Sequence, residues 1–193
     1  MDIIIIDYGA GNIQSIQFAF QRLGVTAVLS NNPEVIQAAE KVIFPGVGEA
    51  SQAMTMLKQS KLDSLIPTLK QDVLGICLGM QLLCKHSEEG DTKGLGVFDV
   101  NVKRFSNAVK VPHMGWNTIN NFQSDLLINI PENSYMYAVH SYCANVGKHT
   151  IARSTYECEF SAALQSKNFY GVQFHPEKSS VDGAQLLQNF LNL

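Results

Sequence analysis

One cysteine stands between two glycines at a point where chemistry could occur. In Gly75-Ile76-Cys77-Leu78-Gly79 it follows an apolar run and precedes a stretch of helical character. Flanking glycines let backbone segments approach closely around a strand-to-helix turn that projects the middle side chain, as in a nucleophile elbow. The start of a helix favours the Cys77 thiolate and leaves the Leu78 N–H free to bind an oxyanion. The alternative is a small core residue, because buried free cysteines are common.

A nucleophilic cysteine needs a base, and His175 is the histidine with supporting neighbours. His175-Pro176-Glu177 ends an apolar strand. Proline pushes the residue before it into an extended conformation, in which residues i and i+2 project to the same side. We therefore expect the Glu177 carboxylate beside the imidazole, where it would fix the tautomer and stabilise the protonated ring. The tripeptide alone also fits a polar strand end, but together with the elbow cysteine it favours a catalytic triad.

The glycine-rich segment Pro45-Gly46-Val47-Gly48 ends another apolar run. Neighbouring strand ends of a parallel sheet share one edge, so this segment is expected near Cys77. Gly46 could let the peptide to Val47 turn over and aim an N–H at the carbonyl that Cys77 attacks. A simple glycine turn is the alternative.

Other polar and aromatic side chains have weaker signals. Gln81, one helical turn beyond Cys77, is expected to face the same way and to meet a polar substrate. Glu89 belongs to an acidic stretch that would ordinarily be a solvated loop. Trp116, the only tryptophan, is either a core aromatic or an anchor that a partner buries. Cys84 is expected to pack in the core.

Cofactor and metal sites are not expected. Tyr8-Gly9-Ala10-Gly11-Asn12 lies where a dinucleotide fingerprint would, but Gln14 replaces the third glycine and no acid ends the second strand, so a tight turn is the better interpretation. The four cysteines have no C-x-x-C pair and no regular spacing with histidine, so neither a zinc site nor a disulfide framework is indicated.

The elements that must position these residues alternate between strand and helix in the first half. Apolar strand-like runs followed by helix-like stretches predict a parallel sheet covered on both faces, hence a single-domain α/β fold over residues 1–193. The second half has strands with little helix between them, which predicts antiparallel additions closed by a last helix. The expected strands are Ile3–Ile6, Val25–Leu29, Val42–Phe44, Val73–Ile76, Val97–Phe105, Tyr135–Tyr142, Thr150–Ser154, Ala162–Gln165 and Phe169–Phe174. The expected helices are Asn12–Leu23, Pro33–Ala39, Glu49–Leu57, Leu78–Lys85 and Val181–Leu191.

Composition limits the function classes. The chain has 193 residues, of which 46% are hydrophobic and 16% charged, as in ordinary globular proteins. The formal net charge of −3 provides no electrostatic footprint for nucleic acid or an anionic membrane. No signal peptide or membrane-spanning run is visible, so a cytoplasmic location is expected.

Taken together, "GICLGMQ" and the distant "HPE" resemble the class I, or triad-type, glutamine amidotransferases, over essentially the whole chain. This resemblance implies a flavodoxin-like open sheet with added antiparallel strands, and a Cys-His-Glu triad that hydrolyses glutamine to glutamate and ammonia through a glutamyl thioester. It assigns roles to the following residues: catalysis to Cys77, His175 and Glu177, the oxyanion hole to Val47 and Leu78, and substrate binding to Gly46, Gly48, Gln81, Glu89, Ser141 and Tyr142.

Within that family, "DYGAGN", "PGVGEA" and "PHMGWN" are similar to the branch that serves imidazole glycerol phosphate synthesis. The resemblance implies a partner: a TIM-barrel cyclase that uses the ammonia to make imidazole glycerol phosphate and aminoimidazole-carboxamide ribotide in histidine biosynthesis. Trp116 and Lys178 would face it. A chain of 193 residues has no room for such a barrel, so a heterodimer is expected.

Three alternatives remain open. The chain could be a glutaminase of the same fold that serves a different synthase, a stand-alone cysteine hydrolase of γ-glutamyl substrates, or a catalytically idle binding module.

Overall fold

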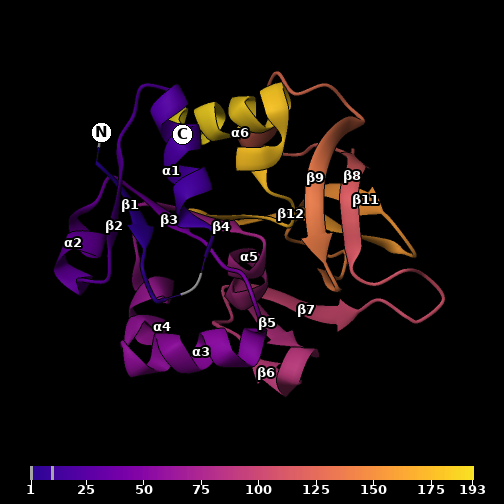
Figure 1. Ribbon diagram of the computed structural model, residues 1–193, viewed down its shortest axis with the longest axis horizontal. Coiled ribbons are helices and arrows are strands. Elements are labelled where there is room, and N and C mark those ends of the chain that lie inside the picture. The colour runs from indigo at the N-terminus through magenta and orange to yellow at the C-terminus, as the bar shows by residue number, and fades with distance from the viewer. Residues whose placement is uncertain (1, 10) are drawn as a thin grey trace.

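A mostly parallel sheet forms the centre of the molecule (Figure 1). The computed structural model describes residues 2–9 and 11–193, so Ala10 of the first glycine turn lies outside the described residues. Over the described residues, eleven strands join in the order β2-β1-β3-β4-β13-β12-β10-β7-β5-β6, with β11 paired to β12. The strands are β1 (Ile3–Ile6), β2 (Ala27–Ser30), β3 (Lys41–Phe44), β4 (Asp72–Ile76), β5 (Cys84–Ser87), β6 (Thr92–Lys93), β7 (Phe98–Arg104), β10 (Tyr142–Ala144), β11 (Thr150–Thr155), β12 (Glu159–Ser166) and β13 (Phe169–Val172).

Strand direction changes halfway across this sheet. The strands β2, β1, β3, β4 and β13 are parallel, whereas β12 is antiparallel to β13, to β10 and to β11. The carboxyl ends of β1, β3, β4 and β13 consequently meet at one edge, which brings the residues after each of them together. The α/β fold class predicted from the sequence is confirmed.

Helices cover both faces of the parallel half, and Figure 1 shows α1 and α6 on one side and α3 and α4 on the other. Side chains alternate along β1: Ile3 and Ile5 pack in a cluster with α1 and α6, while Ile4 and Ile6 pack in a second cluster with α3 and α5. The helices are α1 (Ile13–Arg22), α2 (Pro33–Ala38), α3 (Ala50–Gln59), α4 (Leu62–Leu65), α5 (Leu78–Leu83) and α6 (Ser180–Asn192). Within the described residues, none of these helices is long and apolar enough to cross a membrane.

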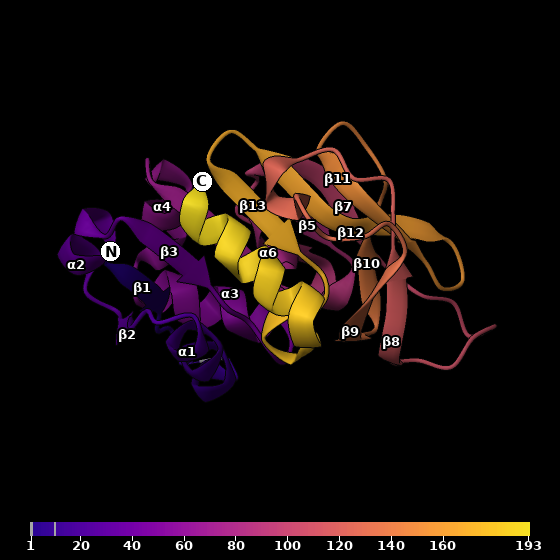
Figure 2. The same ribbon diagram turned by 90° about the horizontal axis from the view of Figure 1, so that it is seen from above.

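A two-stranded antiparallel ribbon stands beside the main sheet. It consists of β8 (His113–Ile119) and β9 (Ser134–His140), whose register runs from His113 opposite His140 to Ile119 opposite Ser134. Figure 2 shows the ribbon at the end of the molecule away from β2. Strand β8 was not predicted, and β9 does not belong to the main sheet as the predicted run of antiparallel strands implied.

Two further expectations about elements were wrong. The helix predicted to reach Lys85 ends at Leu83, and residues from Cys84 onwards form β5, which pairs with β7. The helical pattern continued past Leu83 because Cys84 is apolar and buried, which a helix and a strand satisfy equally. Strand β13 pairs in parallel with β4 and so belongs to the first half of the fold.

Candidate active site

Cys77 occupies a strained turn between β4 and α5. Its backbone angles are φ 55° and ψ −112°, and its N–H donates to the carbonyl oxygen of Val172 at 2.8 Å. Side chains of L-residues rarely adopt a positive φ, and such strain persists where the surrounding structure enforces it. The turn has the conformation expected of a nucleophile elbow.

The flanking glycines are required by close backbone packing. A Cβ atom at Gly79 would lie 2.0 Å from the carbonyl oxygen of Phe44, and one at Gly75 would lie 2.9 Å from the Met80 nitrogen. A Cβ at Gly46 would lie 2.6 Å from the Gly79 nitrogen. The first turn of α5 therefore rests directly on the end of β3, which places Val47 beside the elbow.

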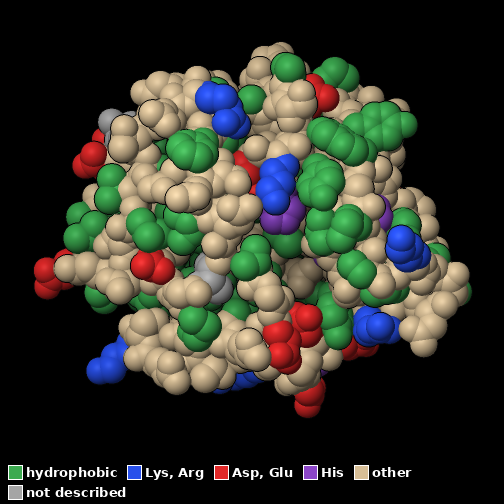
Figure 3. All heavy atoms as spheres, in the orientation of Figure 1, with side chains coloured by type: hydrophobic (Ala, Val, Ile, Leu, Met, Phe, Trp, Pro, Cys, Tyr) green, Lys and Arg blue, Asp and Glu red, His purple; other side chains and the backbone are tan. Residues whose placement is uncertain are grey.

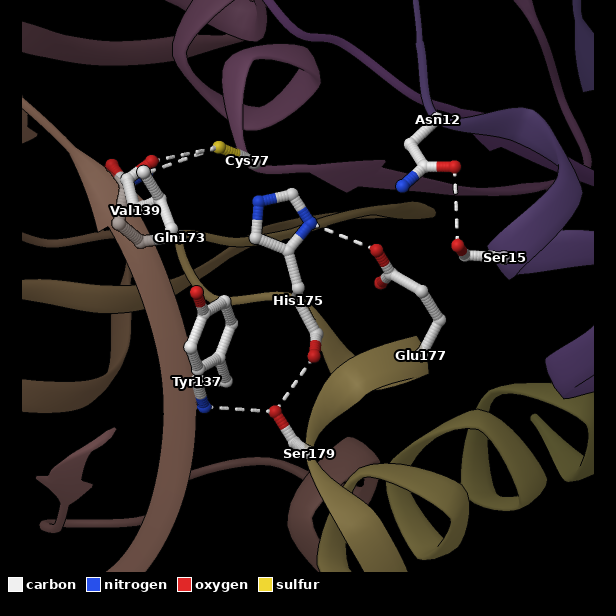
Figure 4. Close-up of polar contacts among 9 residues, drawn as sticks. All are labelled: Asn12, Ser15, Cys77, Tyr137, Val139, Gln173, His175, Glu177 and Ser179. Atoms are coloured by element: carbon white, nitrogen blue, oxygen red, sulfur yellow. Dashed lines mark hydrogen bonds and ion pairs between the residues drawn. The ribbon is translucent and has the colours of Figure 1, made fainter. Parts of the chain in front are cut away.

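His175 and Glu177 follow β13 and lie next to Cys77 (Figure 4). The imidazole Nδ1 is 2.8 Å from the Glu177 Oε1, and both residues are buried. The expected contact therefore forms, but for a different reason: Pro176–Lys178 is a 3-10 turn, not an extended strand end. Ser179 holds this turn, because its hydroxyl donates to the His175 carbonyl at 2.6 Å and accepts the Tyr137 N–H at 3.0 Å.

The electrostatics of His175 favour the imidazolium. Burial alone would lower its pKa, but hydrogen bonds with Cys77 and Glu177, together with their negative charges, raise the pKa to about 10. The second carboxylate oxygen of Glu177, Oε2, is buried and has no hydrogen-bond partner among the described residues. The carboxylate is thus directed at the imidazole through one oxygen, an arrangement that can hold a proton at His175 and return it to a reacting group.

A cavity of about 370 Å³ opens beside Cys77, a size suited to a small polar molecule. Figure 3 shows a hollow in this face, with a histidine side chain beneath a basic one and acidic side chains below. The cavity is lined by Asn12, Val47, Gly48, Cys77, Leu78, Gln81, Glu89, Pro112, Val139, His140, Ser141, Tyr142, His175 and Lys178.

Most residues that the sequence singled out for substrate binding or the oxyanion hole line this cavity. Gly46 does not, because it packs beneath Gly79. Trp116 is 52% exposed and lines a neighbouring groove that Glu177 and Lys178 also border. Its ring meets that of Tyr137 edge to face, with centroids 6.0 Å apart, so it is not a core aromatic.

Sequence reasoning missed several residues at the site, and one of them, Gln173, contacts the sulfur. Its Nε2 lies 3.8 Å from the Cys77 Sγ, and its Oε1 accepts the Gln81 Nε2 at 2.8 Å. Gln173 lies two residues before His175 in the chain, so the alternation of an extended segment could have identified it. Asn12, Pro112, Val139 and His140 line the cavity. Asn12 and Pro112 lie in the motifs DYGAGN and PHMGWN but were given no role, and no pattern in the sequence marked Val139 or His140.

Two more contacts shape the site. Glu89 accepts the Ala50 N–H at 2.9 Å, and burial raises the pKa of its carboxyl group, which the Ala50 hydrogen bond partly opposes. The buried Tyr8 hydroxyl donates to the Pro45 carbonyl at 2.9 Å. Burial raises the pKa of Tyr8, with a further contribution from Cys77, so the phenol remains a donor.

A strained cysteine with a histidine and a glutamate at the carboxyl edge of an α/β sheet is the arrangement of a cysteine-dependent amidase or transferase. The family profile "Glutamine amidotransferase class-I" matches residues 4–193. This chain therefore belongs to the class I glutamine amidotransferase family.

The chain is also similar to individual proteins and to solved structures. The chain is 52% identical to "Imidazole glycerol phosphate synthase subunit HisH" of Bacteroides fragilis strain YCH46, and the alignment covers 100% of both. The protein of the same name from Yersinia pseudotuberculosis is 46% identical, again over 100% of both. Among solved structures, a glutamine amidotransferase from Thermotoga maritima superposes with a TM-score of 0.64 at 19% identity, covering 100% of this chain and 83% of that one, which supports the fold.

Proposed function

We propose that this chain is the glutaminase subunit of an imidazole glycerol phosphate synthase in histidine biosynthesis, folded as one domain over residues 1–193. The observation that carries the proposal is the array of Cys77, His175 and Glu177, in which Cys77 and His175 line a cavity of amino-acid size and Glu177 contacts His175. Full-length identity of 52% to a protein of that name supports the choice of pathway. The reaction belongs in the cytoplasm, where thiols stay reduced.

The first half of the reaction forms a thioester. The Cys77 thiolate attacks the side-chain amide carbon of glutamine, giving a tetrahedral intermediate whose oxygen is negatively charged. The imidazolium of His175 transfers its proton to the amide nitrogen, the carbon–nitrogen bond breaks, and ammonia leaves. Glu177 stabilises the imidazolium through its contact of 2.8 Å with Nδ1.

The second half hydrolyses that thioester. The now neutral imidazole accepts a proton from water, the hydroxide adds to the thioester carbon, and the carbon–sulfur bond breaks to release glutamate and the Cys77 thiolate. Both tetrahedral intermediates need hydrogen-bond donors for the oxyanion. We assign this role to the backbone N–H groups of Leu78 and Val47.

We expect the Gly46–Val47 peptide to turn over when the partner is occupied, with the movement at its loosely packed Val47 end. Val47 is 42% exposed, and a Cβ at Gly48 would meet nothing within 4 Å, whereas Pro45 is held by Tyr8. Because Pro45 is held in place and the residues after Gly46 are loosely packed, a single peptide can rotate there while β3 stays in position.

We assign the α-ammonium and α-carboxylate groups of glutamine to the part of the cavity lined by Gln81, Glu89, Ser141 and Tyr142. The Glu89 carboxylate and the Gln81 amide suit the α-ammonium group, and the backbone at Ser141 and Tyr142 suits the α-carboxylate. Gly48 contributes backbone without a side chain, and Gly46 acts only indirectly because it lies outside the cavity.

The ammonia acceptor is a TIM-barrel cyclase subunit in a heterodimer. Ammonia that reached bulk water would be protonated and lost, so the partner must cover the site. Exposed apolar side chains gather on the ribbon, namely Met114, Trp116 and Tyr135, and Lys178 is exposed beside the cavity. We assign this surface, with Trp116 and Lys178, to the cyclase.

Glutamate release tests the proposal. It is measured for the chain alone, with a purified cyclase subunit, and with cyclase plus its nucleotide ligand; we expect the last condition to be the fastest. Cys77→Ala should abolish release in all three, whereas Cys158→Ala, at an exposed cysteine, serves as the matched control. Equal rates in the three conditions would indicate a stand-alone hydrolase, and no release in any would indicate a binding module.

A further inference from the structure

Two buried histidines form a hydrogen-bonded pair beside the cavity, and one of them, His140, lines its wall. His113 begins β8 and His140 ends β9, and the two residues are directly opposite in the ribbon. Nδ1 of His113 lies 3.0 Å from Nε2 of His140. Neither ring is part of the triad, and neither is needed for the reaction steps above.

The hydrogen bonds determine which nitrogen of each ring carries the proton. Nδ1 of His140 lies 2.8 Å from the carbonyl oxygen of Tyr142. A carbonyl only accepts, so this nitrogen must be protonated, and Nε2 of a neutral ring is then an acceptor. His113 must therefore donate from Nδ1. A single backbone carbonyl thus sets both tautomers.

The surroundings keep both rings neutral. Burial lowers the pKa of His113, and it lowers the pKa of His140 to about 4, with the Tyr142 hydrogen bond opposing this shift and the charges of His113 and His175 adding to it. Aromatic side chains pack around the pair: Tyr156 stacks on His113 with ring centroids 4.1 Å apart, and Phe105 and Phe160 contact His140. The pair can therefore act as a fixed set of donors and acceptors at neutral pH.

The Tyr142 carbonyl connects the pair to the proposed substrate pocket. It also accepts a hydrogen bond from Nε2 of Gln81 at 3.0 Å, and the same Nε2 donates to Gln173 at 2.8 Å. Both protons of the Gln81 amide are thereby occupied. The group that Gln81 can still offer the cavity is its Oε1, an acceptor suited to the α-ammonium group of an amino acid.

We propose that His113 and His140 are positioning residues that give the pocket its preference for a substrate with an α-ammonium group. By holding the Tyr142 carbonyl, the pair fixes the Gln81 amide with its oxygen, not its nitrogen, available to the ligand. This inference rests on the proposed function for the identity of the substrate. Loss of the pair should weaken glutamine binding without comparable loss of the chemical step.

The test compares glutamine with its analogue that lacks the α-amino group, 5-amino-5-oxopentanoate, in the complex with the cyclase. His113→Phe keeps a ring against Tyr156 but leaves Nε2 of His140, a buried acceptor, without its donor. We expect KM for glutamine to rise about ten-fold, equivalent to ~1.4 kcal/mol, with little change in kcat or in the kinetics of the analogue. His113→Asn restores a donor and should recover most of the affinity. His149→Phe, at a half-buried histidine outside the cavity, is the matched control.

Two binding and spectroscopic measurements make the test independent of turnover. Calorimetry of glutamine binding to Cys77→Ala, with and without His113→Phe, should show the same ten-fold difference. Nitrogen-15 NMR of the wild-type chain should show both rings neutral and protonated on Nδ1. Unchanged discrimination between glutamine and its analogue, or a His140 ring protonated on Nε2, would overturn the inference. Absence of any glutamate release by the wild type would instead refute the proposed function, and the NMR result would still test the pair.

Discussion

Gly79→Ala would test the close packing that creates the elbow. The added Cβ would lie 2.0 Å from the Phe44 carbonyl oxygen, so the start of α5 and the end of β3 must separate by about 1.4 Å to restore an ordinary contact of 3.4 Å. Both sides of this contact are backbone, so no change of side-chain rotamer relieves it.

The expected magnitudes follow from that displacement. Alanine is intrinsically better than glycine in a helix by ~1 kcal/mol, whereas overpacking costs about 1–3 kcal/mol and more where backbone must move. We therefore expect a net loss of about 1–2 kcal/mol in the free energy of unfolding. Misplacing reacting groups by about 1 Å reduces rates by roughly 100-fold, so kcat/KM should fall by at least that factor.

Urea unfolding and glutamate release in the presence of the cyclase measure the two effects separately. Gly147→Ala is the matched control, because a Cβ there would meet nothing within 4 Å and the backbone is outside the left-handed region. The control should behave as the wild type. If Gly79→Ala retained kcat/KM within a few-fold of the wild type, the packing argument for the elbow would be refuted.

The remaining predictions concern the triad, the oxyanion segment and the partner surface. Glu177→Gln removes one of the partners that raise the pKa of His175 to about 10, so that pKa should fall and the imidazolium should be lost at lower pH; an unchanged NMR titration of His175 would contradict the ion pair. Tyr8→Phe leaves the buried Pro45 carbonyl without its donor and should lower the free energy of unfolding in urea by about 1–3 kcal/mol. Tyr135→Phe, at an exposed tyrosine, should change the free energy of unfolding little. Equal effects of the two variants would show that the buried Tyr8 hydrogen bond does not contribute to stability. Trp116→Ala should weaken cyclase binding by about 2 kcal/mol or more in calorimetry while leaving the isolated chain folded. Val28→Ala, at an exposed residue of β2, should bind normally, and normal binding by both variants would exclude Trp116 as an anchor.

Local patterns accounted for much of the fold. The apolar runs that became β1, β3 and β4 are buried along nearly their whole length, so they could be recognised without knowing their neighbours. Strand β8 was missed because buried and exposed residues alternate only loosely along it and because it contains Gly115 and Asn117, which are uncommon in strands. It forms a strand because it pairs with β9. Pairing partners distant in sequence are not visible in a local pattern.

The candidate site likewise has residues whose positions the sequence predicted and residues whose positions it did not. The elbow could be predicted from the sequence alone, because the flanking glycines act through the local backbone. The His175–Glu177 contact was predicted too, but from an extended strand end, whereas the structure forms it through a 3-10 turn at Pro176–Lys178. The contacts of Gln173 and His140 came from the tertiary structure, since Gln173 meets Gln81 across 92 positions and His140 meets His113 across 27. Such contacts depend on how the separate ribbon strand β9 lies against the residues that follow β4 and β13, and that arrangement is decided by tertiary packing.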